Sequence, residues 1–241
     1  VVNKDHFDLD YCGSKGLKIT PVVKGDKAEV RVDTFTKSKD VEIKIELKDA
    51  EGNVVDSGTG DSVNFIVENP HLWNGLEDPY LYTVVAIMSK AGKVVDEVSS
   101  ACGIRSIKFD PKTGFYLNGK SYPLHGVSRH QDWKAIGNAI NHDNMDLDME
   151  LIKEIGANTI RLAHYQHDQY FYDLCDKVGM IVWAEIPYIS HHMPGGNKNT
   201  HEQMEELIAQ NYNHPCIVTW GISNEITIKV THKQDMLQNH R

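Results

Sequence analysis

Residues 216–225 read CIVTWGISNE, and this stretch decides how the second half of the chain is interpreted. A short apolar run rich in β-branched residues follows His214-Pro215, which predicts a buried strand that ends at Asn224-Glu225. In a parallel barrel, the loops that follow the strands converge over a packed floor, and the chemistry takes place on that face. Asn224 and Glu225 are therefore the leading candidates for an active site.

The region upstream of this strand alternates between predicted strands and predicted helices. Strands are expected at 124–130, 159–164 and 180–186, and helices at 142–155, 168–178 and 200–212. The first helix follows a possible cap at Asp143, and its shared apolar face consists of Leu147, Leu151, Ile152 and Ile155. This alternation predicts a parallel sheet with helices outside it.

The first hundred residues follow a different pattern. Segments rich in Val, Ile and Thr are separated by turn signals, which is typical of an antiparallel sandwich. In VEIKIEL, residues 41–47, apolar and charged side chains alternate, which predicts a half-buried strand. Further on, Asn118-Gly119 predicts the tight turn of a hairpin that leads into the first barrel strand.

Composition excludes several classes of protein. The chain has 241 residues, of which 40% are hydrophobic and 24% are charged, as in an ordinary soluble globular protein. No apolar run approaches the roughly 18 residues of a membrane span. The net charge of -9 disfavours a nucleic-acid partner. The four cysteines are far apart and lack CxxC spacing, so they are interpreted as buried or free thiols.

Three motifs occur in a family-specific order: GVSRHQDW at 126–133, GANTIRLAHYQHDQYFYDLCDKVGMIVWAEIP at 156–187 and NHPCIVTWGISNE at 213–225. Together they resemble the front half of the catalytic barrel in glycoside hydrolase family 2. That family includes β-galactosidases, β-glucuronidases and β-mannosidases. The resemblance implies an immunoglobulin-like β-sandwich over residues 1–103. It implies the amino-terminal half of a TIM (β/α)8 barrel over residues 104–241.

The length also predicts an incomplete barrel. Four strand–helix repeats are present, whereas a complete barrel needs roughly 250 residues. Half a barrel exposes two unpaired strand edges and half of an apolar interior, so self-association as a homo-oligomer, or marginal stability, is expected. The native amino terminus is expected to be missing, which leaves the compartment open between cytoplasm and periplasm.

The resemblance assigns the chemistry to two carboxylates. A retaining glycosidase needs a carboxylic acid that protonates the leaving oxygen and a second carboxylate about 5 to 5.5 Å away that acts as the nucleophile. The resemblance makes Glu225 the acid/base and places Asn224 to hydrogen-bond the 2-hydroxyl of the sugar. The nucleophile of the family lies on a later strand, so the chain alone is expected to be inactive or nearly so.

Other site residues follow from the same resemblance. His130, Arg161 and His164 match positions that line the sugar pocket or orient the nucleophile. Glu185 matches a position near the pocket floor, where it either supports the pocket or serves the fold. Trp133 either stacks on a sugar face or packs between domains.

No cofactor and no metal are predicted. Some β-galactosidases hold magnesium beside the acid/base through an acid and a histidine in the loop after the third strand. Here Ile189 stands at about the place of that acid, which leaves His191 as the only residual metal candidate.

The motifs look more like those of bacterial β-galactosidases, which predicts a β-galactoside as the carbohydrate substrate. β-Glucuronidase, or another family 2 β-glycosidase, is the first alternative. A non-catalytic carbohydrate-binding or assembly module is the alternative from another class. A serine hydrolase is disfavoured because Gly221-Ile222-Ser223 lacks the second glycine of a GxSxG elbow.

Overall fold

The computed structural model describes residues 3–8, 12–227, 234, 236 and 237. They divide into two compact units. The first unit takes in the described residues up to Tyr122 together with Ala209–Pro215, and the second takes in Pro123–Ile208 and the described residues from Cys216 onward. The predicted domain limits of 1–103 and 104–241 remain a prediction.

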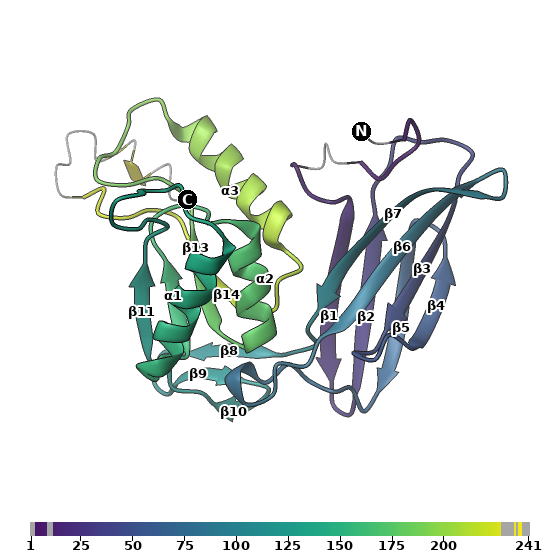
Figure 1. The fold of residues 1–241 in the computed structure, drawn as a ribbon, viewed down its shortest axis with the longest axis horizontal. Coiled ribbons are helices and arrows are strands. Elements are labelled where there is room, and N and C mark those ends of the chain that lie inside the picture. The colour runs from purple at the N-terminus through teal and green to yellow at the C-terminus, as the bar shows by residue number, and fades with distance from the viewer. Residues whose placement is uncertain (1–2, 9–11, 228–233, 235, 238–241) are drawn as a thin grey trace. The chain divides into compact units, whose positions relative to one another are not determined.

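The first unit contains an antiparallel β-sandwich. Its strands are β1 (Leu17–Lys24), β2 (Lys27–Thr34), β3 (Glu42–Lys48), β4 (Val54–Thr59), β5 (Ser62–Glu68), β6 (Tyr82–Lys90) and β7 (Lys93–Cys102). A short 3-10 helix, η1 (Gly75–Glu77), lies between β5 and β6. One sheet has the order β1-β2-β5 and the other β4-β3-β6-β7, which is an immunoglobulin-like arrangement (Figure 1).

The alternation seen in the sequence produces the core of this sandwich. Ile43, Ile45 and Leu47 of β3 are buried, while Glu42 and Lys44 are exposed. This confirms the predicted alternation for residues 42–45. Glu46, which the same alternation turns toward water, is instead buried, and it forms ion pairs with Lys44 and Lys48. The predicted hairpin is also present.

In that hairpin β9 (Gly114–Leu117) pairs with both β8 (Ile107–Asp110) and β10 (Lys120–Ser121). Asn118 and Gly119 both have positive φ, 51° and 76°, as a tight two-residue hairpin turn requires.

The second unit is built on a parallel sheet. Its strands are β11 (Gly126–Arg129), β12 (Thr159–Leu162), β13 (Ile181–Glu185) and β14 (Ile217–Gly221), hydrogen-bonded in that order. All adjacent pairs are parallel. The helices α1 (His142–Glu154), α2 (Gln169–Val178) and α3 (Asn197–Asn211) alternate with the strands. This confirms the predicted partial TIM barrel.

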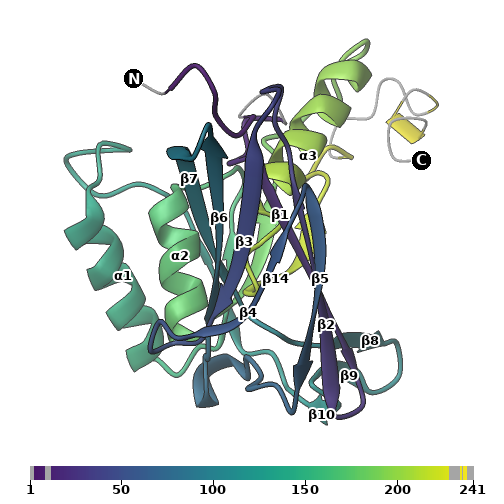
Figure 2. The ribbon, with the colours of Figure 1, turned by 90° about the vertical axis from the view of Figure 1, so that its right-hand side faces the viewer.

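The two faces of this sheet differ in burial. On one face Ile160, Leu162, Val182 and Ala184 are fully buried. Helices α1 and α2 cover that face, because Arg129 of β11 contacts Asp148 of α1 and the ring of Phe171 of α2. Trp183, on the opposite face, remains 40% exposed. Figure 2 shows both helices on one side of the unit.

Helix α1 buries a different face from the one predicted. Met145 and Met149 are buried, whereas Leu147, Leu151 and Ile155 are exposed. Two apolar stripes run along this helix, and the position of the sheet, which the sequence of the helix does not contain, selects the methionine stripe. The predicted cap Asp143 is also wrong.

The cap of α1 is Asn141, whose side chain accepts from the backbone N–H of Asn144 while the Asn144 side chain accepts from the N–H of Asn141. This reciprocal pair satisfies two backbone donors at the start of the helix.

The strand at CIVTWGISNE ends earlier than predicted. Strand β14 stops at Gly221, and Ile222 is 47% exposed rather than buried. Asn224 then forms an isolated parallel bridge with Ile189.

The cysteines behave as the sequence predicts. All four are free thiols, and Cys102, Cys175 and Cys216 are buried, while Cys12 is half-buried. Burial raises the pKa of Cys102 to about 12. No described helix is long and apolar enough to cross a membrane.

Candidate active site

Arg161, Glu185 and Asn224 meet near the carboxyl ends of three neighbouring strands. Arg161 Nε donates to Glu185 Oε1 at 2.6 Å, and Nη2 donates to Glu185 Oε2 at 3.2 Å. The same Nη2 donates to Asn224 Oδ1 at 2.8 Å. Glu185 is only 1% exposed, so this two-point ion pair compensates a buried charge.

Two histidines adjoin this cluster. His164 Nδ1 lies 3.2 Å from both Glu185 Oε2 and Arg161 Nη2, so this nitrogen either donates to the carboxylate or accepts from the guanidinium. The ring of His130 meets the ring of His164 edge-on, with centroids 5.1 Å apart. The structure therefore brings together five of the predicted residues: His130, Arg161, His164, Glu185 and Asn224.

The loop after β13 holds the backbone of Asn224 on both sides. The N–H of Asn224 donates to Tyr188 O at 2.9 Å, and the N–H of Ser190 donates to Asn224 O at 2.9 Å. Tyr188 in turn makes a short hydrogen bond between its hydroxyl and His192 Nδ1. His192 is therefore engaged in the fold, while His191 is exposed. The prediction that no metal binds here remains a prediction.

Glu225 stands apart from the cluster. Its side chain is exposed, and its backbone has a left-handed φ of 56°. Among the described residues, Glu225 makes no hydrogen bond or ion pair. Its assignment as the acid/base remains a prediction.

Gly221 lets the cluster approach strand β14 closely. A Cβ at this position would lie 2.6 Å from Glu185 Cγ and 2.5 Å from Trp183 Nε1. No larger residue fits without displacing the carboxylate that binds Arg161.

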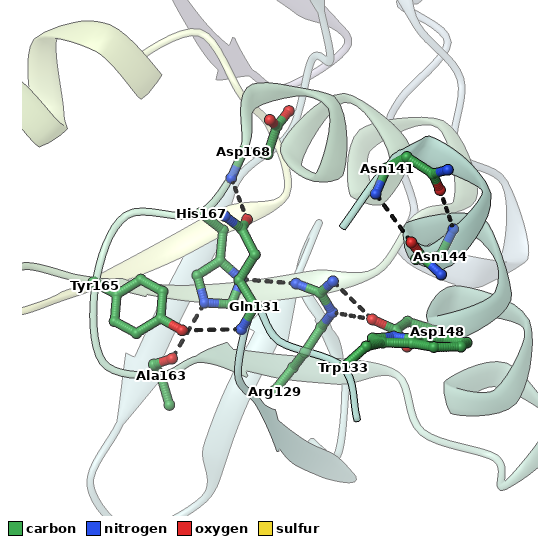
Figure 3. A network of polar contacts seen from close by, with 10 residues as sticks. All are labelled: Arg129, Gln131, Trp133, Asn141, Asn144, Asp148, Ala163, Tyr165, His167 and Asp168. Carbon is green, nitrogen blue, oxygen red and sulfur yellow. Dashed lines mark hydrogen bonds and ion pairs between the residues drawn. The ribbon is translucent and has the colours of Figure 1, made fainter. Parts of the chain in front are cut away.

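A second polar network lies on the helix-covered side of the sheet (Figure 3). The side chain of Arg129 is 5% exposed, and its Nε donates to Asp148 Oδ2 at 2.8 Å. Its Nη2 lies 2.7 Å from the same oxygen, at ion-pair distance but without hydrogen-bond geometry. Arg129 Nη1 lies 3.0 Å from His167 Nδ1, and its guanidinium carbon is 4.0 Å from the ring centre of Phe171. A buried cation is thus matched by a carboxylate, an imidazole and an aromatic face.

His167 is neutral in this network at neutral pH. Burial lowers the pKa of His167 to about 4, and the positive charge of Arg129 acts in the same direction. Its Nε2 lies 3.2 Å from Ala163 O, where only an N–H can bind. The proton is therefore on Nε2, and Nδ1 accepts from Arg129.

Trp133 belongs to this second network rather than to the first cluster. Its Nε1 donates to Asp148 Oδ1 at 2.9 Å, which fixes the indole against helix α1. Its predicted roles in sugar stacking or domain packing remain predictions.

Comparison with known families agrees with this geometry. The model of the glycosyl hydrolases family 2 TIM barrel domain matches residues 110–241, more than half of the chain. A second model, glycosyl hydrolases family 2, matches residues 15–105. The chain belongs to glycosyl hydrolase family 2.

Some of the individual relatives are named β-glucuronidase and others β-galactosidase. A β-glucuronidase of Bacteroides fragilis is 45% identical over 173 residues, covering 67% of this chain and 24% of that protein. A putative β-glucuronidase of Formosa agariphila is 37% identical over 226 residues, covering 87% and 27%. A β-galactosidase of Thermoanaerobacter pseudethanolicus is 34% identical over 158 residues, covering 65% and 21%. The chain thus spans about a quarter of these curated relatives.

A solved family 2 structure matches nearly the whole chain. It is an FMN-binding β-glucuronidase from Faecalibacterium prausnitzii L2-6, 42% identical, with a TM-score of 0.95. The alignment covers 99% of this chain and 38% of that one.

Sequence reasoning within family 2 missed the network around Arg129. One signal was present, since Arg129 shares a strand face with Val127 and the period of two therefore predicts that it is buried. A buried arginine requires a carboxylate partner. Nothing in the sequence pattern identifies Asp148 as that partner.

Proposed function

We propose that this chain supplies the front half of the sugar-cleaving site of a retaining family 2 β-glycosidase, with Glu225 as the acid/base. One observation carries the proposal: Arg161 joins Glu185 to Asn224 where three parallel strands end. In this barrel architecture, catalytic residues come from the carboxyl ends of several strands.

The hydrogen bonds around Asn224 support its role in sugar binding. Because Arg161 donates to Oδ1, the amide nitrogen Nδ2 is directed elsewhere, and it makes no hydrogen bond among the described residues. Nδ2 can then donate to the 2-hydroxyl of a sugar, an interaction that strengthens in the transition state of glycoside cleavage.

Glu185 is not suited to be the nucleophile. Its carboxylate is buried, and both oxygens are bound by Arg161, with His164 near one of them. A nucleophile must instead reach the anomeric carbon of the sugar. We therefore propose that the second carboxylate comes from a longer chain. The curated relatives are such longer chains, since the matched residues cover 24% and 27% of two of them.

That longer chain also has to change the surroundings of Glu225. A general acid that donates near neutral pH needs burial or a neighbouring carboxylate. Glu225 is exposed in this structure. We propose that the remaining strands of the barrel cover it and bring the nucleophile beside it.

A β-glucuronide is the substrate that we propose first, ahead of the β-galactoside predicted from the motifs. The relatives named β-glucuronidase include the 45% identical protein of B. fragilis, whereas the β-galactosidase of T. pseudethanolicus is 34% identical. The guanidinium of Arg161 is already paired with Glu185, so a different cation has to bind the carboxylate of a uronic acid.

The test uses a longer protein that carries the complete barrel. Its hydrolysis of p-nitrophenyl β-glucuronide and p-nitrophenyl β-galactoside is compared, with Asn224→Ala measured beside the unaltered protein. We expect turnover of the glucuronide to exceed that of the galactoside, and Asn224→Ala to lower kcat/KM. Faster turnover of the galactoside overturns the substrate assignment, and no turnover of either overturns the proposal.

A further inference from the structure

The two histidines beside the candidate site are flanked by residues that bind one another. His130 lies between Arg129 and Gln131, and His164 lies between Ala163 and Tyr165. The N–H of Ala163 donates to Arg129 O at 3.0 Å. On the other flank, the N–H of Gln131 donates to the hydroxyl of Tyr165 at 3.0 Å. Residues 129–131 and residues 163–165 are therefore joined both before and after the histidines. Figure 3 shows the contact between Gln131 and Tyr165.

The side chain of His167 also links the two segments. Its Nδ1 accepts from Arg129, whose backbone precedes His130, and its Nε2–H donates to the carbonyl of Ala163, which precedes His164. The imidazole of His167 thus binds Arg129, which precedes His130, and Ala163, which precedes His164. Asp148 fixes the other side of the guanidinium, so Arg129 has little freedom to rotate.

We propose that Arg129, Asp148 and His167 are positioning residues that hold His130 against His164 at the edge of the sugar pocket. None of the three touches the Arg161–Glu185–Asn224 cluster in the described structure. They act through the backbone of residues 129–131 and 163–165. The consequence for catalysis rests on the proposed function, whereas the placement of the two rings does not.

The geometry explains why a neutral imidazole is used. Position 167 needs one acceptor for Arg129 and one donor for Ala163, on opposite sides of a flat group buried beside Phe171. Phenylalanine at this position keeps a ring of similar size but offers neither. Glutamine offers both, through its carbonyl oxygen and its amide N–H.

The first test measures ring placement in the 241-residue chain. Imidazole resonances of His130 and His164 are recorded by NMR in the unaltered chain, His167→Phe and His167→Gln. We expect His167→Phe to shift both sets of resonances and to weaken the cross-peaks between the two rings. The His130 and His164 resonances of His167→Gln should stay close to those of the unaltered chain. Unchanged resonances in His167→Phe overturn the proposal.

A matched control separates positioning from general loosening of the helices. Tyr170 of α2 donates to Asp146 of α1 at 2.6 Å, so Tyr170→Phe also removes a hydrogen bond between these helices. Among the described residues, the side chain of Tyr170 makes no hydrogen bond to residues 129–131 or 163–165, and we expect the resonances of His130 and His164 to stay in place. Shifts as large as those of His167→Phe would assign the effect to helix packing and overturn the proposal.

The second test measures catalysis in the longer protein. A misplacement of about 1 Å in an active site can cost roughly 100-fold in rate. We expect His167→Phe to lower kcat by about 10- to 100-fold with a smaller change in KM, and Tyr170→Phe to leave both unchanged. An unchanged kcat in a folded His167→Phe protein contradicts the catalytic part. If His167→Phe does not fold, Arg129→Lys serves instead, because it keeps the charge but loses the forked geometry.

The two tests fail in different ways. A longer protein without glycosidase activity refutes the proposed function but leaves the NMR prediction standing. An active protein whose His130 and His164 resonances ignore position 167 refutes the positioning proposal alone.

Discussion

Acidification should destabilise the second unit through His167. Burial lowers the pKa of this imidazole from 6.5 to about 4 in the folded protein. Between these two pH values the unfolded chain binds a proton that the folded chain does not, so stability falls as the pH falls. At about 1.4 kcal/mol per pH unit, the full loss between pH 6.5 and pH 4 is about 3 kcal/mol. Above pH 6.5 this contribution is constant.

The assay is urea denaturation of the chain and of His167→Gln at several pH values between about pH 7 and pH 4.5. Glutamine does not titrate, so its unfolding free energy lacks this term, while the carboxylates contribute equally to both proteins. The difference between the two unfolding free energies therefore isolates the contribution of His167. We expect the unaltered chain to lose stability faster on acidification, approaching 3 kcal/mol more at the lowest pH. Parallel curves for the two proteins would refute the reasoning.

Three further predictions concern single contacts. Arg161→Met should lower the unfolding free energy by about 3 kcal/mol because it leaves Glu185 buried without its cation. Combining Arg161→Met with Glu185→Leu should recover part of that loss. A double variant with a lower unfolding free energy than Arg161→Met contradicts this. Asn141→Ala should cost about 1 kcal/mol, measured by the urea midpoint, through loss of the α1 cap; an unchanged midpoint argues against the cap. In the folded chain a thiol reagent at neutral pH should modify Cys12 but not Cys102, whose burial raises its pKa to about 12; rapid labelling of Cys102 would show that the sandwich core opens.

The sequence predicts those features that depend on local pattern. Period-two alternation predicts the exposure of Glu42 and Lys44 in β3, and Asn118-Gly119 predicts the hairpin. The cluster of Arg161, Glu185 and Asn224 could also be predicted, because parallel strands bring their carboxyl ends to one edge of a sheet.

Features that depend on distant packing could not be predicted in this way. Helix α1 carries two apolar stripes, and its own sequence does not say which one meets the sheet. The contact of Arg129 with Asp148 and His167 joins residues 19 and 38 positions apart. No periodicity links such positions, so only the folded chain identifies the partners.

The identity of the proton donor is tested most directly by the leaving-group dependence of Glu225→Gln in the longer protein. A general acid contributes roughly 100- to 10,000-fold when the leaving oxygen needs a proton, and far less when the leaving group departs readily as an anion. We expect Glu225→Gln to lose activity of that order on an alkyl glycoside and to retain much more on a dinitrophenyl glycoside. An equal, small effect on both substrates would contradict the assignment of Glu225 as the acid/base.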